Sequence, residues 1–159
     1  MSSPLSSEKP VVAPVVAPVV APLFPPTDPN APPTADHNKC MTRLELTIAT
    51  NWHAQKILDG ITELGCKLPP NFFVCRTCEQ EMTGGFLLPE RGSKVYNPKI
   101  IMCENKQIDT RMFQNTVIHE LIHAYDICRA KVDWNNCRHY ACTEIRASSL
   151  RFAFAGSDI

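Results

Sequence analysis

The sequence lacks a surplus of charge of either sign. Its 159 residues include 16 Lys and Arg against 16 Asp and Glu, a formal net charge of zero at pH 7. A nucleic-acid binder normally carries a basic excess, and so does a polybasic membrane-binding arm. The charge balance argues against both classes of protein, and we expect no nucleic-acid partner.

Long apolar runs are also missing. No stretch approaches the roughly 20 consecutive apolar residues that a membrane-spanning helix needs. The apolar segment PVVAPVVAPVVAP has a proline at every fourth position, which blocks a helix interior. Arginine is absent from the first 42 residues, which is unlike a typical mitochondrial transit peptide. We therefore expect residues 1–35 to form a disordered, extended Pro/Val/Ala-rich tail.

A folded domain is predicted over residues 36–159, where the composition changes. Apolar residues at close to helical spacing predict one helix between Cys40 and Leu64, and Gly65 is expected to end it. Glycines and prolines separate three short β-like runs: residues 72–75, 85–88 and 99–103.

Two further helices are predicted in the second half. The first is capped by Asp109 or Thr110 and reaches about residue 130, and the second covers about residues 138–154. The order helix, small sheet, helix, helix predicts an α+β fold.

One short motif carries chemistry. Residues 119–123 read His-Glu-Leu-Ile-His, and on a helix the two histidines lie one turn apart on one face, so both imidazoles can bind one metal ion. Glu120 is turned about 100° around the helix axis, close enough to reach metal-bound water but poorly placed as a ligand. Zn²⁺ lowers the pKa of such a water toward about 7, and Glu120 can take its proton as it attacks a peptide carbonyl. The motif predicts one catalytic zinc ion held by His119 and His123, with Glu120 as general base.

The residues around this motif leave the helix apolar on nearly every side, as expected of a helix at the centre of a small domain. These residues are Val117, Ile118, Leu121 and Ile122. Two unpaired histidines and a glutamate there would suffer a desolvation penalty unless they share a partner. The alternative is that all three are satisfied polar residues of the core. Asp126 could hold a ligand or an arginine by hydrogen bonding, or be an ordinary surface carboxylate.

A catalytic zinc ion normally has a third protein ligand and an open fourth position. A third histidine six residues after the second is absent, because Arg129 occupies that position. Glu144 lies 21 residues after His123, as in thermolysin-type enzymes with a glutamate on a following helix, and we favour it as the third ligand. His139 is the rival. Whichever is not a ligand could orient the site or stabilise an oxyanion, and Tyr140 could also do the latter.

Eight cysteines are spread over the predicted domain: Cys40, Cys66, Cys75, Cys78, Cys103, Cys128, Cys137 and Cys142. An even number this high is typical of disulfides in an oxidising compartment. No secretory signal peptide is recognisable, although disulfides require an oxidising compartment. The mitochondrial intermembrane space is consistent with both observations, because proteins are oxidised there outside the secretory route. The CxxC at Cys75 could instead be half of a structural metal site, and reduced core thiols are the third alternative. Eight cysteines allow 105 pairings, so the connectivity stays open.

The region from His119 to Ala147 resembles one family. Its motifs HELIHAYD, CRA, VDW and HYACTEIRA are similar to those of the mitochondrial inner membrane metalloprotease family Atp twenty-three, whose animal relative is also named a Ku-binding protein. A weaker likeness extends back to about Cys40. The resemblance implies a zincin-like domain in which His119 and His123 are zinc ligands and Glu120 is the catalytic glutamate.

The resemblance also implies a location and a partner. The family lies peripherally on the intermembrane-space side of the inner membrane, matures an ATP synthase subunit and assists assembly of that complex's membrane sector. The implied function is a zinc-dependent endopeptidase with a protein substrate, and the alternative is a non-proteolytic assembly factor that binds an ATP synthase subunit. A nuclear repair-associated interaction protein is a third hypothesis, against which the neutral charge and the many cysteines count. Family members usually continue with a further Cys-containing tail where this sequence ends at Ile159, which implies a C-terminally shortened member.

Overall fold

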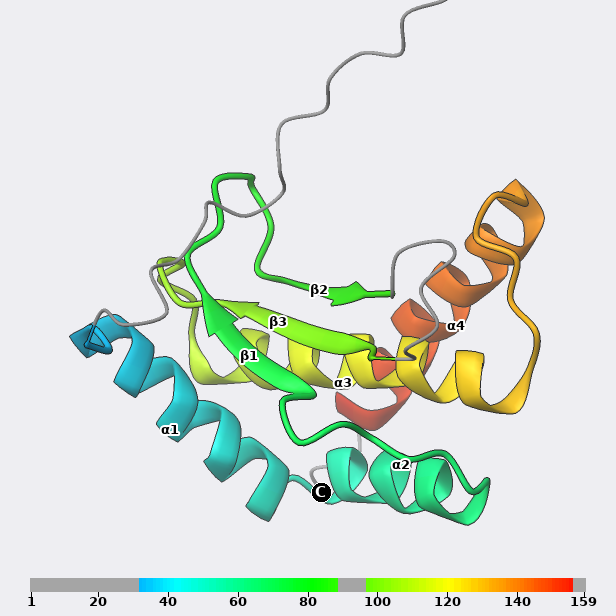
Figure 1. The fold of residues 1–159 in the computed structure, drawn as a ribbon, viewed down its shortest axis with the longest axis horizontal. Coiled ribbons are helices and arrows are strands. Elements are labelled where there is room, and N and C mark those ends of the chain that lie inside the picture. Colours follow the sequence, from blue (N-terminus) through cyan, green and yellow to red (C-terminus); the bar gives the residue numbers. More distant parts are fainter. Residues whose placement is uncertain (1–31, 89–96, 156–159) are drawn as a thin grey trace, which may run out of the picture.

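The computed structural model describes residues 32–88 and 97–155, with side chains described as far as Leu150. Within those residues, the chain forms four helices and a small three-stranded sheet (Figure 1). In chain order the elements are α1 (Ala35–Thr50), α2 (Trp52–Glu63), β1 (Phe73–Arg76), β2 (Gly84–Leu87), β3 (Lys99–Cys103), α3 (Thr110–Arg129) and α4 (Cys137–Ala155). The α+β prediction is confirmed. The predicted tail falls almost entirely outside the described residues.

The prediction of one continuous first helix was wrong, because α1 and α2 are separate. Between them, the Asn51 side chain accepts hydrogen bonds from the N–H groups of His53 and Ala54 at 3.0 and 3.2 Å, and thereby caps α2. Apolar spacing continues across this cap, so periodicity alone does not reveal the break. Gly65 adopts φ +78° directly after α2, which confirms the predicted end of the helix.

The sheet has the order β1-β3-β2, with β1 parallel and β2 antiparallel to β3. α3 runs behind the sheet in Figure 1 and contacts α1, α2, α4, β2 and β3. The four apolar residues expected to surround the motif are all buried, namely Val117, Ile118, Leu121 and Ile122. α3 is therefore the central helix, and Asp109 caps it by accepting a hydrogen bond from the N–H of Met112 at 2.7 Å.

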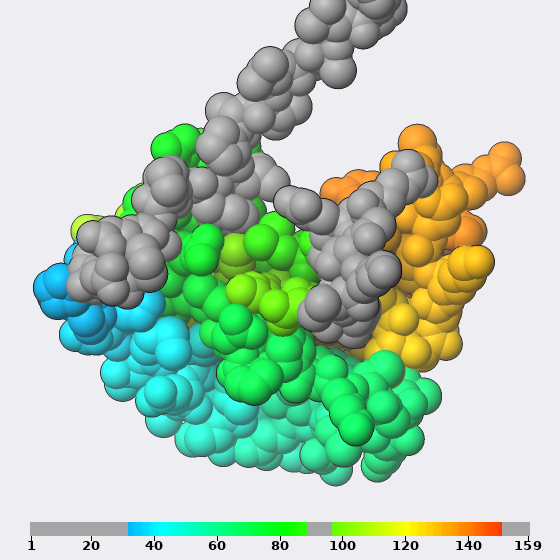
Figure 2. Space-filling view, in the orientation of Figure 1, coloured from blue at the N-terminus to red at the C-terminus, as the bar shows by residue number. Residues whose placement is uncertain are grey.

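Three other helices contribute to the face of the domain shown in Figure 2. α1 and α2 cover the lower side of the domain in Figure 2, and the start of α4 lies at the upper right, where residues 137–142 are exposed. In the described part of the chain, no helix combines the length and the apolar character needed to cross a membrane.

Three disulfides cross-link the domain: one joins α1 to β1, one joins the segment after α2 to α3, and one joins the turn after β1 to β3. They are Cys40–Cys75, Cys66–Cys128 and Cys78–Cys103. The two cysteines of the CxxC motif thus pair with different partners, so the structural-metal alternative for this motif was wrong. Cys137 and Cys142 are exposed thiols, and the predicted disulfide framework therefore includes six of the eight cysteines.

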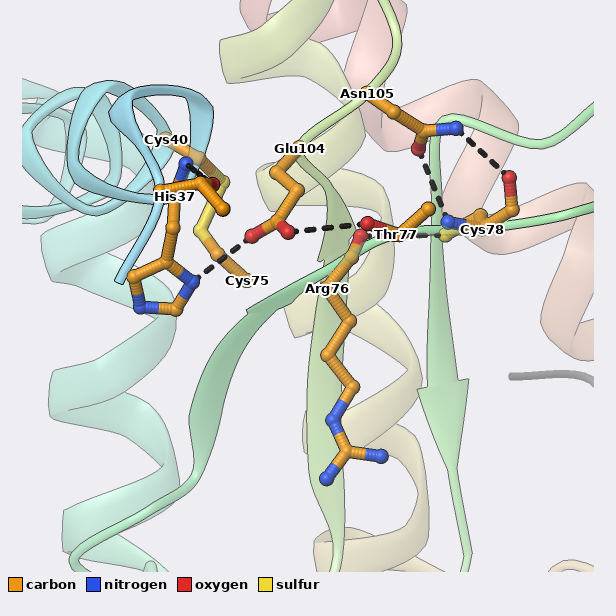
Figure 3. Close-up of polar contacts among 9 residues, drawn as sticks. His37, Cys40, Cys75, Arg76, Thr77, Cys78, Glu104 and Asn105 are labelled. Atoms are coloured by element: carbon orange, nitrogen blue, oxygen red, sulfur yellow. Dashed lines mark hydrogen bonds and ion pairs between the residues drawn. A yellow bond between two sulfur atoms is a disulfide. The ribbon is translucent and has the colours of Figure 1, made fainter. Parts of the chain in front are cut away.

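Polar contacts reinforce this disulfide-linked end of the domain (Figure 3). Glu104, just after β3, places Oε2 2.8 Å from His37 Nδ1 on α1, and Thr77 donates its hydroxyl to Oε1. The Asn105 side chain accepts a hydrogen bond from the N–H of Cys78 and donates one to its carbonyl. Covalent and polar contacts together fix α1, the CxxC turn and the end of β3.

Candidate metal centre

Two helices bring the candidate metal ligands together. On α3, His119 Nε2 and His123 Nε2 lie 3.1 Å apart. Glu144 approaches from α4, with Oε2 3.4 Å from His119 Nε2 and Oε1 3.5 Å from His123 Nε2. One ligand atom from each of the three residues lies within 4.8 Å of the others, the one such group found in the described part of the chain.

The donor atoms fit a divalent metal ion. Two imidazole nitrogens and one carboxylate are a donor set that catalytic zinc sites use. The Nδ1 atom of His123 is buried and has no hydrogen-bond partner among the described residues. Burial lowers the pKa of His123, while the charges of Glu144 and Asp126 act in the opposite direction. The lowered pKa favours the neutral imidazole, which is the form that binds a metal.

Glu120 lies beside the three candidate ligands but is not one of them. Its side chain is buried, with the residue 7% exposed. The pKa of Glu120 is raised to about 8, mainly by burial and also by the charge of Glu144, while the backbone N–H of Phe86 acts in the opposite direction by donating to the carboxylate. A carboxyl group with a pKa near neutrality can both accept and return a proton.

His139, the rival third ligand, lies elsewhere. It is exposed, and its Nδ1 accepts a hydrogen bond from the backbone N–H of Asp133 at 3.1 Å. It lines a separate hollow with Asp126 and Arg146. The structure therefore places Glu144, and not His139, beside the two histidines of α3.

The site opens into a cleft of about 280 Å³ between β2, α3 and α4. The cleft is lined by Gly84, Gly85, Phe86, Leu88, His119, Glu120, His123, Trp134, Tyr140 and Glu144. Phe86 stacks against the His123 ring at a centroid distance of 6.5 Å, and Trp134 meets the same ring edge-on at 6.1 Å. Nothing in the sequence indicated a role for either aromatic residue, because Phe86 on β2 and Trp134 in the loop before α4 come close to the motif only in the folded chain.

Tyr140 also lines the cleft and is half exposed. The charge of Glu144 raises the pKa of Tyr140, with burial and a hydrogen bond to Glu144 adding to the effect. Its hydroxyl therefore keeps its proton at neutral pH and can act as a hydrogen-bond donor.

Within the described residues, β2 forms one edge of the sheet, with no strand on its outer side. Ile100 on β3 donates its N–H to the carbonyl of Phe72, on the β1 side, at 2.7 Å. Phe86 is the antiparallel partner of Ile100, so its N–H and carbonyl are directed away from β3. The free edge of β2 therefore adjoins Glu120.

Asp126 supports the site from behind. It is only 1% exposed, although it carries a carboxylate. Arg129 of α3 donates to it from Nε at 3.1 Å, and Arg146 of α4 donates from Nε at 3.1 Å. Of the two roles considered from the sequence, the structure shows the one in which Asp126 holds arginines.

Comparisons with known proteins identify a peptidase family. The family model described as "Peptidase M76 family" matches residues 38–154. No solved structure matches the chain.

Several curated proteins are similar in sequence. A "Mitochondrial inner membrane protease ATP23 homolog" of Xenopus laevis is 37% identical over 116 residues, which cover 72% of this chain and 46% of the relative. The Homo sapiens homolog is also 37% identical over 116 residues, covering 72% of this chain and 44% of the relative. The "Mitochondrial inner membrane protease atp23" of Schizosaccharomyces pombe is 41% identical over 91 residues, or 57% of this chain and 45% of the relative. The chain thus spans just under half the length of these relatives.

Proposed function

Because the chain belongs to the peptidase M76 family, we propose that it is a zinc-dependent endopeptidase that cleaves a protein substrate. One observation carries the proposal: two histidine nitrogens and the Glu144 carboxylate converge beside the buried carboxyl group of Glu120. A structural metal site would not need a buried proton carrier next to its ligands.

The ligand assignment follows from the same geometry. His119, His123 and Glu144 would hold the ion, and the cleft lies in front of them. A bound zinc ion supplies Lewis-acid chemistry, because it lowers the pKa of water and polarises a peptide carbonyl.

Glu120 moves the proton. Its carboxylate accepts a proton from the attacking water and delivers it to the amine that leaves, so the group ends each cycle as it began. Its burial and its raised pKa support both halves of this transfer. Tyr140 keeps its hydroxyl proton and donates a hydrogen bond to the oxygen of the scissile carbonyl as negative charge develops there.

The substrate binds as an extended strand on the free edge of β2. Main-chain hydrogen bonds to such an edge orient a peptide without demanding a particular sequence. The outward carbonyl of Phe86 can accept a hydrogen bond from such a strand, while the Phe86 N–H donates to Glu120, so a strand added there passes the catalytic group. The apolar faces of Phe86 and Trp134 favour apolar substrate side chains near the cleaved bond.

The proposed membrane comes from the relatives, which are named mitochondrial inner membrane proteases, and the proposed side and substrate come from the family resemblance of the motifs between His119 and Ala147. We place it at the inner membrane, attached peripherally on the intermembrane-space side, and assign an ATP synthase membrane-sector subunit as its substrate. The three disulfides support this location, because they suit an oxidising compartment.

The test is Glu120→Gln, which keeps the size of the side chain but removes its ability to carry a proton. Metal content should equal that of the wild type, whereas peptide cleavage should fall by about 10²- to 10⁴-fold. Undiminished cleavage would refute the assignment. Metal content of Glu144→Ala beside His139→Ala tests the third ligand, since only the first should lower it.

The same variant separates cleavage from the alternative function as an assembly factor. Cells carrying Glu120→Gln are assayed for processing of the ATP synthase subunit and for assembly of the complex. Processing should stop. Normal assembly without processing would favour a binding function in addition to the enzymatic one.

A further inference from the structure

The position of Glu144 depends on how α4 lies against α3. α3 carries both histidines, but Glu144 comes from a helix that no disulfide joins to the rest of the described chain, since Cys137 and Cys142 are thiols. A rotation or shift of α4 would therefore separate the carboxylate from its partners. Some other contact must hold α4 in place.

One ion pair, between a buried carboxylate and a half-buried arginine, links the two helices at the required point. The Nε atom of Arg146 lies 3.0 Å from Oδ1 and 3.1 Å from Oδ2 of Asp126. Asp126 follows His123 by three residues on α3, and Arg146 follows Glu144 by two on α4. The pair thus joins the part of α3 that follows His123 in sequence to the part of α4 that follows Glu144.

The burial of Asp126 restricts how α4 can lie against α3. Asp126 is 1% exposed, and a buried carboxylate without a paired cation is strongly unfavourable. α4 can satisfy Asp126 only while Arg146 points toward α3. Next to Arg146, the fully buried Ala147 packs with Ile118 and Ile122 and allows the helices to approach closely.

We propose that Arg146 is a positioning residue: through its ion pair with Asp126 it sets the register of α4, so that Glu144 faces His119 and His123. The inference rests on the proposed function, because its end point is metal binding by Glu144. It assigns Arg146 no contact with substrate or metal.

The chain contains a matched control. Arg129 also donates to Asp126 from Nε, at 3.1 Å, and its side chain is 39% exposed against 38% for Arg146. Arg129 belongs to α3 itself, three residues after Asp126, so its ion pair with this carboxylate lies within one helix. Replacing either arginine by glutamine removes one positive charge beside Asp126, whereas only replacing Arg146 removes the link between the two helices.

The experiment measures the dissociation constant of Zn²⁺ by competition with a chromophoric chelator. It uses the full chain as wild type, Arg146→Gln, Arg129→Gln, Glu144→Gln and the Arg146→Gln/Glu144→Gln double variant. Arg146→Gln should weaken zinc binding by about 10- to 100-fold, the range typical for groups that orient metal ligands. Arg129→Gln should change it by less than about twofold. In the Glu144→Gln background, Arg146→Gln should cause no further loss, since there is no longer a ligand to position.

Each contrary result has a separate meaning. Equal losses for Arg146→Gln and Arg129→Gln, or the same loss from Arg146→Gln in both backgrounds, would overturn the positioning role while leaving the proposed ligands intact. Unchanged zinc affinity in Glu144→Gln would instead remove the proposed ligand itself.

If Arg146→Gln does not fold, Arg146→Lys is measured in its place. Lysine keeps a cation near Asp126 but replaces the planar guanidinium by a point charge. Weaker zinc binding with an unchanged thermal unfolding temperature of the metal-free protein supports positioning. A lowered unfolding temperature with unchanged zinc binding overturns it.

Discussion

The two sides of α3 are held by different kinds of contact. On the side of the sheet and of α1 and α2, three disulfides join elements that are distant in sequence, and one of them ends on α3 itself at Cys128. On the side of α4, the described contacts are non-covalent: apolar packing around Ala147, the Asp126–Arg146 ion pair, and the approach of Glu144 to His119 and His123.

This difference divides the candidate metal centre. His119, Glu120 and His123 belong to the helix that the disulfide-linked side anchors, whereas Glu144 belongs to the helix that non-covalent contacts hold. We therefore expect changes on the first side to act mainly on the free energy of unfolding. Changes on the second side should act on zinc affinity as well, because they move one ligand relative to the other two.

The largest effect is expected from removing the disulfide that ends on α3. Cys66 and Cys128 are separated by 62 residues, and a cross-link closing a loop of that size stabilises the folded state by about 4 kcal/mol in the chain-entropy treatment. The double variant Cys66→Ala/Cys128→Ala should lose about that much free energy of unfolding, measured by urea titration.

The control for that experiment also removes two cysteines. Cys137 and Cys142 are exposed thiols, so Cys137→Ala/Cys142→Ala should change the free energy of unfolding by no more than about 0.5 kcal/mol. A loss as large as that of the disulfide variant would show that the side of α4 is also covalently stabilised, and the contrast between the two sides would disappear.

A smaller effect is expected from enlarging the contact between α3 and α4. Ala147 is fully buried against Ile118 and Ile122, and overpacking such a position typically costs about 1–3 kcal/mol. Ala147→Leu should therefore lower the free energy of unfolding by about 2 kcal/mol and should also weaken zinc binding, because α4 must move outward with Glu144. Urea titration and chelator competition on the same samples measure the two effects.

The matched control places the same substitution on the same helix. Ala141 is exposed, so Ala141→Leu should leave both quantities near their wild-type values. If Ala147→Leu destabilised the fold but bound zinc normally, Glu144 could not depend on how closely the two helices pack.

Local patterns in the sequence predict much of this structure. The periodicity around the motif, the cap at Asp109 and the stop at Gly65 are each encoded within a few residues, and all three appear in the fold. Asn51 is equally local, yet the apolar spacing continues past it and hides the cap. The helical spacing of His119 and His123 also anticipates their shared face, because helix geometry alone sets it.

Contacts between distant segments could not be predicted in the same way. Nothing in the spacing of cysteines shows that Cys75 pairs with Cys40 and Cys78 with Cys103. The choice between Glu144 and His139 depends on which face of α4 meets α3, and the Asp126–Arg146 pair that influences this choice spans 20 residues. Such pairings are properties of the packed chain rather than of any short segment.

The smallest effect concerns β2, which lies on the disulfide-linked side but carries no disulfide itself. A Cβ atom at Gly84 would lie 2.7 Å from Thr116 Cγ2 and 2.9 Å from the Ile101 carbonyl oxygen, so Gly84→Ala must push the strand away from α3 and β3. At Gly85 the added atom would meet only the mobile methyl end of Met82, at 2.9 Å. We expect Gly84→Ala to cost about 1 kcal/mol of unfolding free energy and to lower peptide cleavage, because the strand edge beside Glu120 shifts.

Zinc affinity distinguishes the possible origins of that loss. Gly84→Ala should leave zinc binding unchanged, since all three proposed ligands lie on α3 and α4, and Gly85→Ala should come close to wild type in cleavage and stability. Reduced cleavage with intact zinc binding would mean that β2 contributes to catalysis through the substrate. Reduced zinc binding would mean that β2 also supports the ligands. The position of the ligands would then not depend on α3 and α4 alone.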